Sequence, residues 1–296
     1  MSSARRDDAL AWATPAVFVL IWSTGFIVAR YGMPHAPPFK FLALRYALSI
    51  VCFLAWISWS RPPWPRKGSQ WRHLAITGVL MHALYLGGVW AAVKAGMGSG
   101  VSALIVGLQP VLTAIWVSST GARVSGRQWL GLAFGFTGLL LVVSRKFGQG
   151  GAADHVDLVN LLFAVAALLS ITAGTLYQKR FVAPCDVRTA NVVQLGAALL
   201  ATLPLALFES EGMRWNAEFA GAMAWSVLAL TLGGSSLLYL LIQRGAATAV
   251  TSLFYMVPPC TALMAWLLFA EPITVATLLG TALTAFGVSL VVRAAK

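Results

Sequence analysis

Apolar segments of about 20 residues follow one another along nearly the whole chain, and short polar connections separate them. Each segment is long enough to cross a bilayer core of roughly 30 Å as an α-helix. Membrane β-strands alternate over about ten residues, whereas these segments are uniformly apolar. We therefore predict an all-α integral membrane protein with ten transmembrane helices. The predicted spans are residues 9–30, 39–59, 73–94, 98–119, 126–144, 158–179, 189–208, 219–243, 246–269 and 273–292.

The pattern repeats when the sequence is shifted by 149 residues. Residues 96–143 then align with residues 245–292 without a gap, and eleven pairs are identical. The shift is about half of the chain, so we predict an N-terminal repeat, residues 1–148, and a C-terminal repeat, residues 149–296, within one membrane domain. Five spans in each repeat would turn the second copy upside down. Inverted repeats are typical of transporters with a site near the membrane midplane.

Composition and charge agree with a membrane protein. The chain is 59% hydrophobic and 10% charged, whereas about a quarter of a soluble domain is charged. The net charge of +12 does not indicate a nucleic-acid partner, because the basic residues lie in short loops. With a cytoplasmic N-terminus, 14 Lys and Arg residues fall on the cytoplasmic side and six on the other. This imbalance predicts that both termini are cytoplasmic.

No motif of a catalytic or metal site is present in the sequence. There is no phosphate-binding loop, no zinc-protease helix and no nucleophile elbow. The four histidines do not have metal-ligand spacing, and the three cysteines suit neither a zinc site nor a disulfide framework. We therefore predict a protein that is not an enzyme and that holds no metal or cofactor.

Three basic side chains are candidates for a coupling or charge site. All nine acidic residues lie in loops, termini or span ends, although ion-coupled transporters often keep a carboxylate in the membrane. His82 is the deep titratable candidate, and a neutral histidine hydrogen-bonded within the bundle is the favoured interpretation. Arg45 lies inside the second span, where it contacts substrate, pairs with backbone carbonyls or extends to the surface. Lys94 closes the third span.

Aromatic and polar residues gather on one face of the third span, where His82, Tyr85 and Trp90 share helical spacing. In the eighth span, Tyr239 is the repeat partner of Trp90, and Gln243 follows one turn later. An inverted repeat would place both faces on one central space. Such walls suit an organic solute, and the alternative is that the aromatics only pack helices.

Prolines at matching positions, Pro110 and Pro259, predict kinks in the fourth and ninth spans. Broken helices in corresponding parts of two repeats point to a transporter site. Glycine stripes in the fifth and tenth spans predict close helix packing there instead. The predicted substrate-cavity residues are Trp22, Ser23, His82, Tyr85, Trp90, Gln109, Tyr239, Gln243 and Tyr255.

Three segments resemble the drug/metabolite transporter superfamily, EamA type: WSTGF in the first span, PPFKFLALRYAL in the second, and FAEPITVATLLGTALTAFGVSLV at the end. Glu271-Pro272 is the most specific match, whereas the first repeat has Ala122 where a glutamate is common. Within that superfamily the chain resembles YddG-type amino acid exporters. The resemblance implies ten helices, a bacterial-type inner (plasma) membrane location and export of small metabolites.

These observations favour an inner-membrane exporter of aromatic or apolar amino acids that works by alternating access about a central cavity. Its partners would be the small-molecule substrate and the lipid bilayer. A channel-like facilitator of small neutral solutes, an exporter of drugs, nucleobases or sugars, and an accessory membrane subunit remain as alternatives. The sequence leaves open the exact substrate, the coupling to protons and the oligomeric state.

Overall fold

A computed structural model describes residues 3–119, 125–147, 155–243 and 256–294. Within these ranges the chain forms helices and no strand, apart from an isolated parallel bridge between Phe147 and Val156. The elements are α1 (Ser3–Gly32), α2 (Pro38–Ser60), α3 (Gly68–Gly78), η1 (Val79–Leu84), α4 (Tyr85–Lys94), α5 (Ser99–Val106), α6 (Gln109–Ser119), α7 (Gly126–Lys146), α8 (Leu158–Phe181), α9 (Val187–Phe208), α10 (Ala217–Trp225), η2 (Ser226–Ser235), α11 (Ser236–Gln243), α13 (Val257–Phe269) and α14 (Val275–Ala294).

Seven helical stretches in the described part of the chain are long and apolar enough to cross a membrane. Three of them are composite: α3, η1 and α4 run on as Gly68–Lys94, α5 and α6 form Ser99–Trp116, and α10 to α11 form Ala217–Leu240. Three shorter apolar stretches lie at Val17–Gly32, Val257–Phe269 and Val275–Leu290. The seven long stretches coincide with seven predicted spans, and the shorter ones overlap the first, ninth and tenth predicted spans, which stay a prediction. Part of the ninth predicted span lies outside the described residues.

Local sequence explains where several helices begin and end. Ser125 caps α7 and Asp157 caps α8, each in a reciprocal box with the side chain three residues on. Pro38 opens α2, where its missing N–H would lack a helical partner in any case. Arg61 and Ala270 end α2 and α13 in left-handed backbone, with φ of 46° and 53°.

Two spans contain π-helical turns, η1 and η2. A shift of η1 by 149 residues gives residues 228–233, which fall within η2. π-helical turns are rare and occur frequently at functional sites. The two irregular segments therefore occupy equivalent positions of the sequence repeat.

The predicted break beside Pro110 is present, because a turn at Gly107 and Leu108 separates α5 from α6. A Cβ on Gly107 would lie 2.6 Å from Cγ of Pro258, so glycine allows α5 and α13 to meet here. Pro259 lies in the first turn of α13, and the residues before Met256 lie outside the described part.

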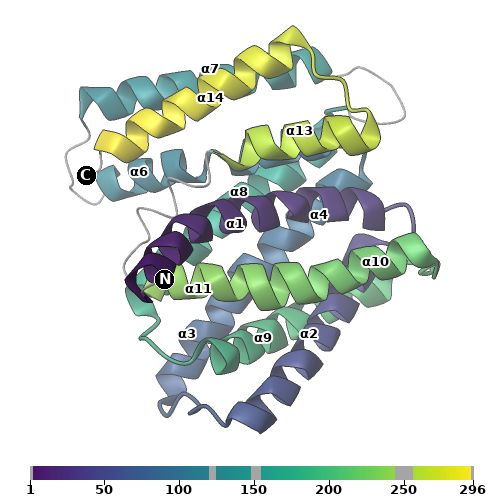
Figure 1. Cartoon of the computed structure of the whole chain (residues 1–296). Helices are drawn as coiled ribbons and strands as arrows, with labels where there is room; N and C mark the ends of the chain where they lie inside the picture. Colours follow the sequence, from purple (N-terminus) through teal and green to yellow (C-terminus); the bar gives the residue numbers. More distant parts are fainter. Residues whose placement is uncertain (1–2, 120–124, 148–154, 244–255, 295–296) are drawn as a thin grey trace.

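Helices related by the repeat pack against each other. The two most extensive contacts between helices join α7 to α14 and α2 to α9. α7 and α14 run side by side at the top of Figure 1, apart from α2, α3 and α9. Their glycine stripes face each other, which gives the close helix packing that was predicted, and Thr284 donates a hydrogen bond to the carbonyl of Gly135, its repeat partner (3.3 Å).

Candidate functional site

A cavity lies among α1, α2, α8, α9 and the two composite spans that contain η1 and η2. The centre of a water molecule can move through about 50 Å³ of it, which is room for a few waters and not for a larger solute. The lining residues are Trp22, Gly25, Phe26, Arg45, Met81, His82, Tyr85, Leu86, Val89, Trp90, Ile171, Gln178, Gln194, Leu230, Ser235, Leu238 and Tyr239.

Five of the predicted cavity residues line this space. Trp22, His82, Tyr85, Trp90 and Tyr239 come from three separate stretches of the chain, Val17–Gly32, Gly68–Lys94 and Ala217–Leu240. The η1 turn places His82 at the wall, where its backbone carbonyl accepts a hydrogen bond from the Tyr46 hydroxyl (2.7 Å). The structure therefore brings together the aromatic faces that the repeat predicted.

Two other predicted residues lie elsewhere. Ser23 is buried, and its hydroxyl donates to the carbonyls of Val19 (2.7 Å) and Val257 (3.5 Å), which ties α1 to α13. Gln109 is buried and donates to the Thr175 hydroxyl (3.0 Å), which ties α6 to α8. Both side chains stabilise helix contacts.

The last two predicted cavity residues cannot be placed. Tyr255 and the side chain of Gln243 lie outside the described residues.

Arg45 lies at the cavity wall and is only 3% exposed. Its Nε donates a hydrogen bond to the hydroxyl of Thr231 in η2 (3.0 Å). The Thr231 hydroxyl in turn donates to the carbonyl of Ser226 (2.8 Å). The two π-helical segments thus both contribute to the polar side of the cavity.

Two glutamines at the cavity wall were not among the predicted residues, namely Gln178 on α8 and Gln194 on α9. The side-chain nitrogen of each is buried and has no hydrogen-bond partner in the described part of the chain. A Cβ on Gly78 would lie 2.6 Å from Cα of Gln194, so glycine permits the close approach of α9. The sequence repeat could have indicated Gln194, because Gln194 is the repeat partner of Arg45.

Lys94 does not line the cavity, although it was a candidate charge site. Its Nζ pairs with Glu211 (2.6 Å) and donates to the carbonyl of Met33 (3.2 Å). The hydrogen bond from Lys94 lowers the pKa of Glu211. Glu209 accepts hydrogen bonds from the first N–H groups of α2, those of Phe39 (2.9 Å) and Lys40 (2.8 Å). The connection between α9 and α10 is therefore attached to the ends of α2 and α4.

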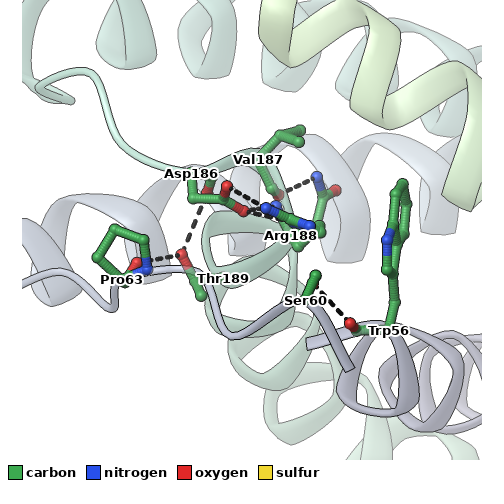
Figure 2. Close-up of polar contacts among 8 residues, drawn as sticks. Trp56, Ser60, Pro63, Asp186, Val187, Arg188 and Thr189 are labelled. Atoms are coloured by element: carbon green, nitrogen blue, oxygen red, sulfur yellow. Dashed lines mark hydrogen bonds and ion pairs between the residues drawn. The ribbon is translucent and has the colours of Figure 1, made fainter. Parts of the chain in front are cut away.

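A second polar cluster ties together the connections at the opposite ends of these helices (Figure 2). Asp186 caps α9 and pairs with Arg188 (2.7 Å), whose guanidinium lies over the ring of Trp56 (5.4 Å to the centroid). The hydrogen bond from Arg188 lowers the pKa of Asp186. Thr189 donates to the carbonyl of Pro63 (3.4 Å), and the hydroxyl of Tyr239 lies 2.9 Å from Sγ of Cys185. Tyr239 thus belongs both to the cavity wall and to this end of the bundle.

Glu271 is a buried carboxylate, only 8% exposed, although sequence placed it in a connection. It accepts hydrogen bonds from the backbone N–H groups of Ser99 (3.0 Å) and Gly100 (3.4 Å) at the start of α5. A carboxylate is favourable at a helix N-terminus, where N–H groups lack helical partners. No group of acidic, histidine or cysteine side chains that could hold a metal occurs among the described residues.

Comparisons with known proteins give one family. The profile of the EamA-like transporter family matches this sequence twice, at residues 10–144 and 158–293. An uncharacterized transporter of Archaeoglobus fulgidus is 24% identical over 283 residues, which cover 93% of this chain and 94% of that protein. The uncharacterized inner membrane transporter YedA of Escherichia coli K12 is 24% identical over 254 residues, 84% of this chain and 80% of YedA.

Two further similarities are to a protein with a named activity and to a solved structure. A probable amino-acid metabolite efflux pump of Escherichia coli K12 is 24% identical over 201 residues, which cover 68% of this chain and 62% of the pump. A crystal structure of another protein superposes with a TM-score of 0.65 at 19% identity, over 94% of both chains. That likeness shows a shared fold.

Proposed function

Because this chain belongs to the EamA-like transporter family, we propose that it exports small metabolites, foremost amino acids with aromatic or apolar side chains, across a bacterial inner membrane. The observation that carries the proposal is the cavity, whose walls combine Trp22, Tyr85, Trp90 and Tyr239 with a few polar side chains. Aromatic walls with a small number of placed polar groups are typical of sites for organic solutes. The similarity to an amino-acid metabolite efflux pump supports the same substrate class.

Ten transmembrane helices in two inverted halves form the proposed architecture. The double match of the family profile, the equivalent positions of η1 and η2, and the pairing of α2 with α9 and α7 with α14 support it. The three shorter apolar helices would join the seven longer ones as spans. With both termini in the cytoplasm, the Lys94–Glu211 pair faces outward and the Asp186–Arg188 pair faces the cytoplasm.

Transport would follow from movement of the two halves about the cavity. The narrow cavity must widen to admit an amino acid. The polar contacts around Lys94 and Glu211 at one end would therefore separate while those around Asp186 and Arg188 at the other end stay formed, and the reverse. The break at Gly107 and the π-helical turns are the places where the helices can bend, because their backbone hydrogen bonding already departs from the α-helical pattern. A site reached alternately from either side needs no continuous pore.

The test is uptake of labelled amino acids by liposomes that contain only this purified protein, with and without a pH gradient. We expect saturable uptake without a gradient, and a large loss of uptake in Trp22→Ala. Trp129→Ala is the matched control, because Trp129 lies on α7 away from the cavity and is 61% exposed. Folded protein that transports no amino acid from a broad panel would overturn the amino-acid assignment and favour drugs, nucleobases or sugars, or an accessory role.

A further inference from the structure

The guanidinium of Arg45 is a buried positive charge beside the cavity, and its position has a consequence for the substrate. Arginine stays protonated in proteins, so its charge remains when the side chain leaves water. A buried charge is costly unless an opposite charge or several hydrogen bonds compensate it. The residues around Arg45 therefore show what completes the site.

No carboxylate of the described part of the chain is paired with Arg45. Each carboxylate whose side chain the structure describes is engaged elsewhere: Asp157 caps α8, Asp186 pairs with Arg188, Glu209 caps α2, Glu211 pairs with Lys94, Glu218 lies against His35, and Glu271 caps α5. The side chains of the other three acidic residues, Asp7, Asp8 and Asp154, lie outside the described part of the chain.

The hydrogen bonding of Arg45 is also incomplete. Its Nε donates to Thr231, and the described residues offer no hydrogen-bond partner to its two terminal nitrogens. Those nitrogens form the planar fork that binds a carboxylate through two parallel hydrogen bonds. Side-chain nitrogens of Gln178 and Gln194 at the same cavity are likewise without partners there.

We propose that Arg45 binds the carboxylate of the transported solute. The inference rests on the proposed transport function and narrows its substrate class to small carboxylic acids, amino acids among them, with an aromatic or aliphatic side chain. The apolar part of the solute lies against Trp22 and Trp90, which line the same cavity. Neutral solutes such as nucleobases and sugars lack the group that compensates the buried charge.

Competition by unlabelled analogues shows which chemical groups of the solute the protein recognises. Uptake of labelled L-phenylalanine or L-leucine, whichever is faster, is measured in liposomes with an excess of three unlabelled analogues: the amide, the amine without a carboxyl group, and the acid without an amino group. We expect the acid to compete and the amide and amine to compete about 10- to 100-fold less well, the range for a lost hydrogen bond to a charged group.

Variants test the residue itself. Arg45→Gln should raise KM for the amino acid by about 10-fold or more, and Arg45→Lys should restore part of the loss. Arg145→Gln is the matched control, because Arg145 is exposed on α7. Thr231→Val removes the hydrogen-bond partner of Arg45 Nε and leaves the charge of Arg45 in place. A small effect of Thr231→Val on KM, beside a large effect of Arg45→Gln, shows that Arg45 acts by binding the ligand and not by holding η2.

The outcomes distinguish this inference from the proposed function. Equal competition by the amide, or wild-type KM in folded Arg45→Gln, would overturn the role of Arg45 while transport stands. Absence of any uptake by the folded wild-type protein would overturn both. If Arg45→Gln does not fold, the competition series on the wild-type protein still decides, because it needs no variant.

Discussion

The contact between α7 and α14 depends on glycine at positions where their backbones meet, and Gly138→Ala tests this directly. A Cβ on Gly138 would lie 2.5 Å from Oγ1 and 2.8 Å from the backbone nitrogen of Thr284. Ordinary contacts of a Cβ begin at 3.4 Å, and the backbone oxygen of Gly280 on α14 lies closer still, so the backbone of α14 would have to move by more than about 0.6 Å. Gly221 on α10 is the matched control, because a Cβ there meets nothing within 4 Å.

Two opposing effects set the magnitude. Overpacking a tight contact costs about 1–3 kcal/mol, and replacing glycine by alanine inside a helix stabilises it by up to about 1 kcal/mol. We therefore expect Gly138→Ala to lower the free energy of unfolding by about 1–2 kcal/mol, and Gly221→Ala to raise it by about 0.5–1 kcal/mol. Because α7 and α14 do not line the cavity, transport per folded molecule should not change.

Thermal unfolding of the two purified variants in one detergent, at one scan rate, measures the difference. Gly138→Ala should unfold a few degrees below the wild-type protein and Gly221→Ala at or above it. If Gly138→Ala proved as stable as Gly221→Ala, the close approach of α7 and α14 would be refuted.

Three further predictions concern the charged groups. Glu271→Ala should destabilise the protein by about 1–3 kcal/mol through loss of the α5 cap, and unchanged thermal unfolding would contradict that role. The lowered pKa of Asp186 means that its charge stabilises the fold above about pH 4 and that this stabilisation is lost as the pH falls through the lower folded pKa. Asp186→Asn should therefore be less stable than wild type by less than about 1 kcal/mol at pH 7, and by a smaller amount at pH 3; an equal difference at both would refute the ion pair. Glu211→Lys should slow or abolish transport with little change in the free energy of unfolding, and the double variant Lys94→Glu with Glu211→Lys should restore transport. If the double variant stays inactive, the Lys94–Glu211 ion pair has no role in transport.

Sequence predicted the all-helical fold and the seven long apolar helices, because residues in lipid must be apolar and must satisfy their own backbone hydrogen bonds. The break beside Pro110 and the close packing of the glycine stripes were predicted for local reasons, and both are present. The division into two inverted repeats stays a prediction that the helix pairs support. The π-helical turns were not predicted, since neither VLMHAL nor SVLALTLGGS differs in composition from an apolar α-helix.

The cavity was predictable only in part, because apolar residues surround a membrane helix on every side and do not show which face meets the cavity. Trp22 lines the cavity, whereas Ser23, one residue on and about 100° around the helix, meets α13. Lys94 was a candidate charge site because it closes the third span, but its long side chain reaches Glu211. Gln178 lies at the end of a predicted span and therefore resembled an interfacial residue.

Exchange across the liposome membrane tests the central claim most directly. Uptake of a labelled amino acid by the purified wild-type protein is compared in liposomes that contain buffer alone and in liposomes preloaded with the unlabelled amino acid. For alternating access about one cavity, we predict uptake that saturates with concentration and is faster into preloaded liposomes. Uptake that rises linearly with concentration and does not respond to preloading would contradict alternating access and indicate a channel.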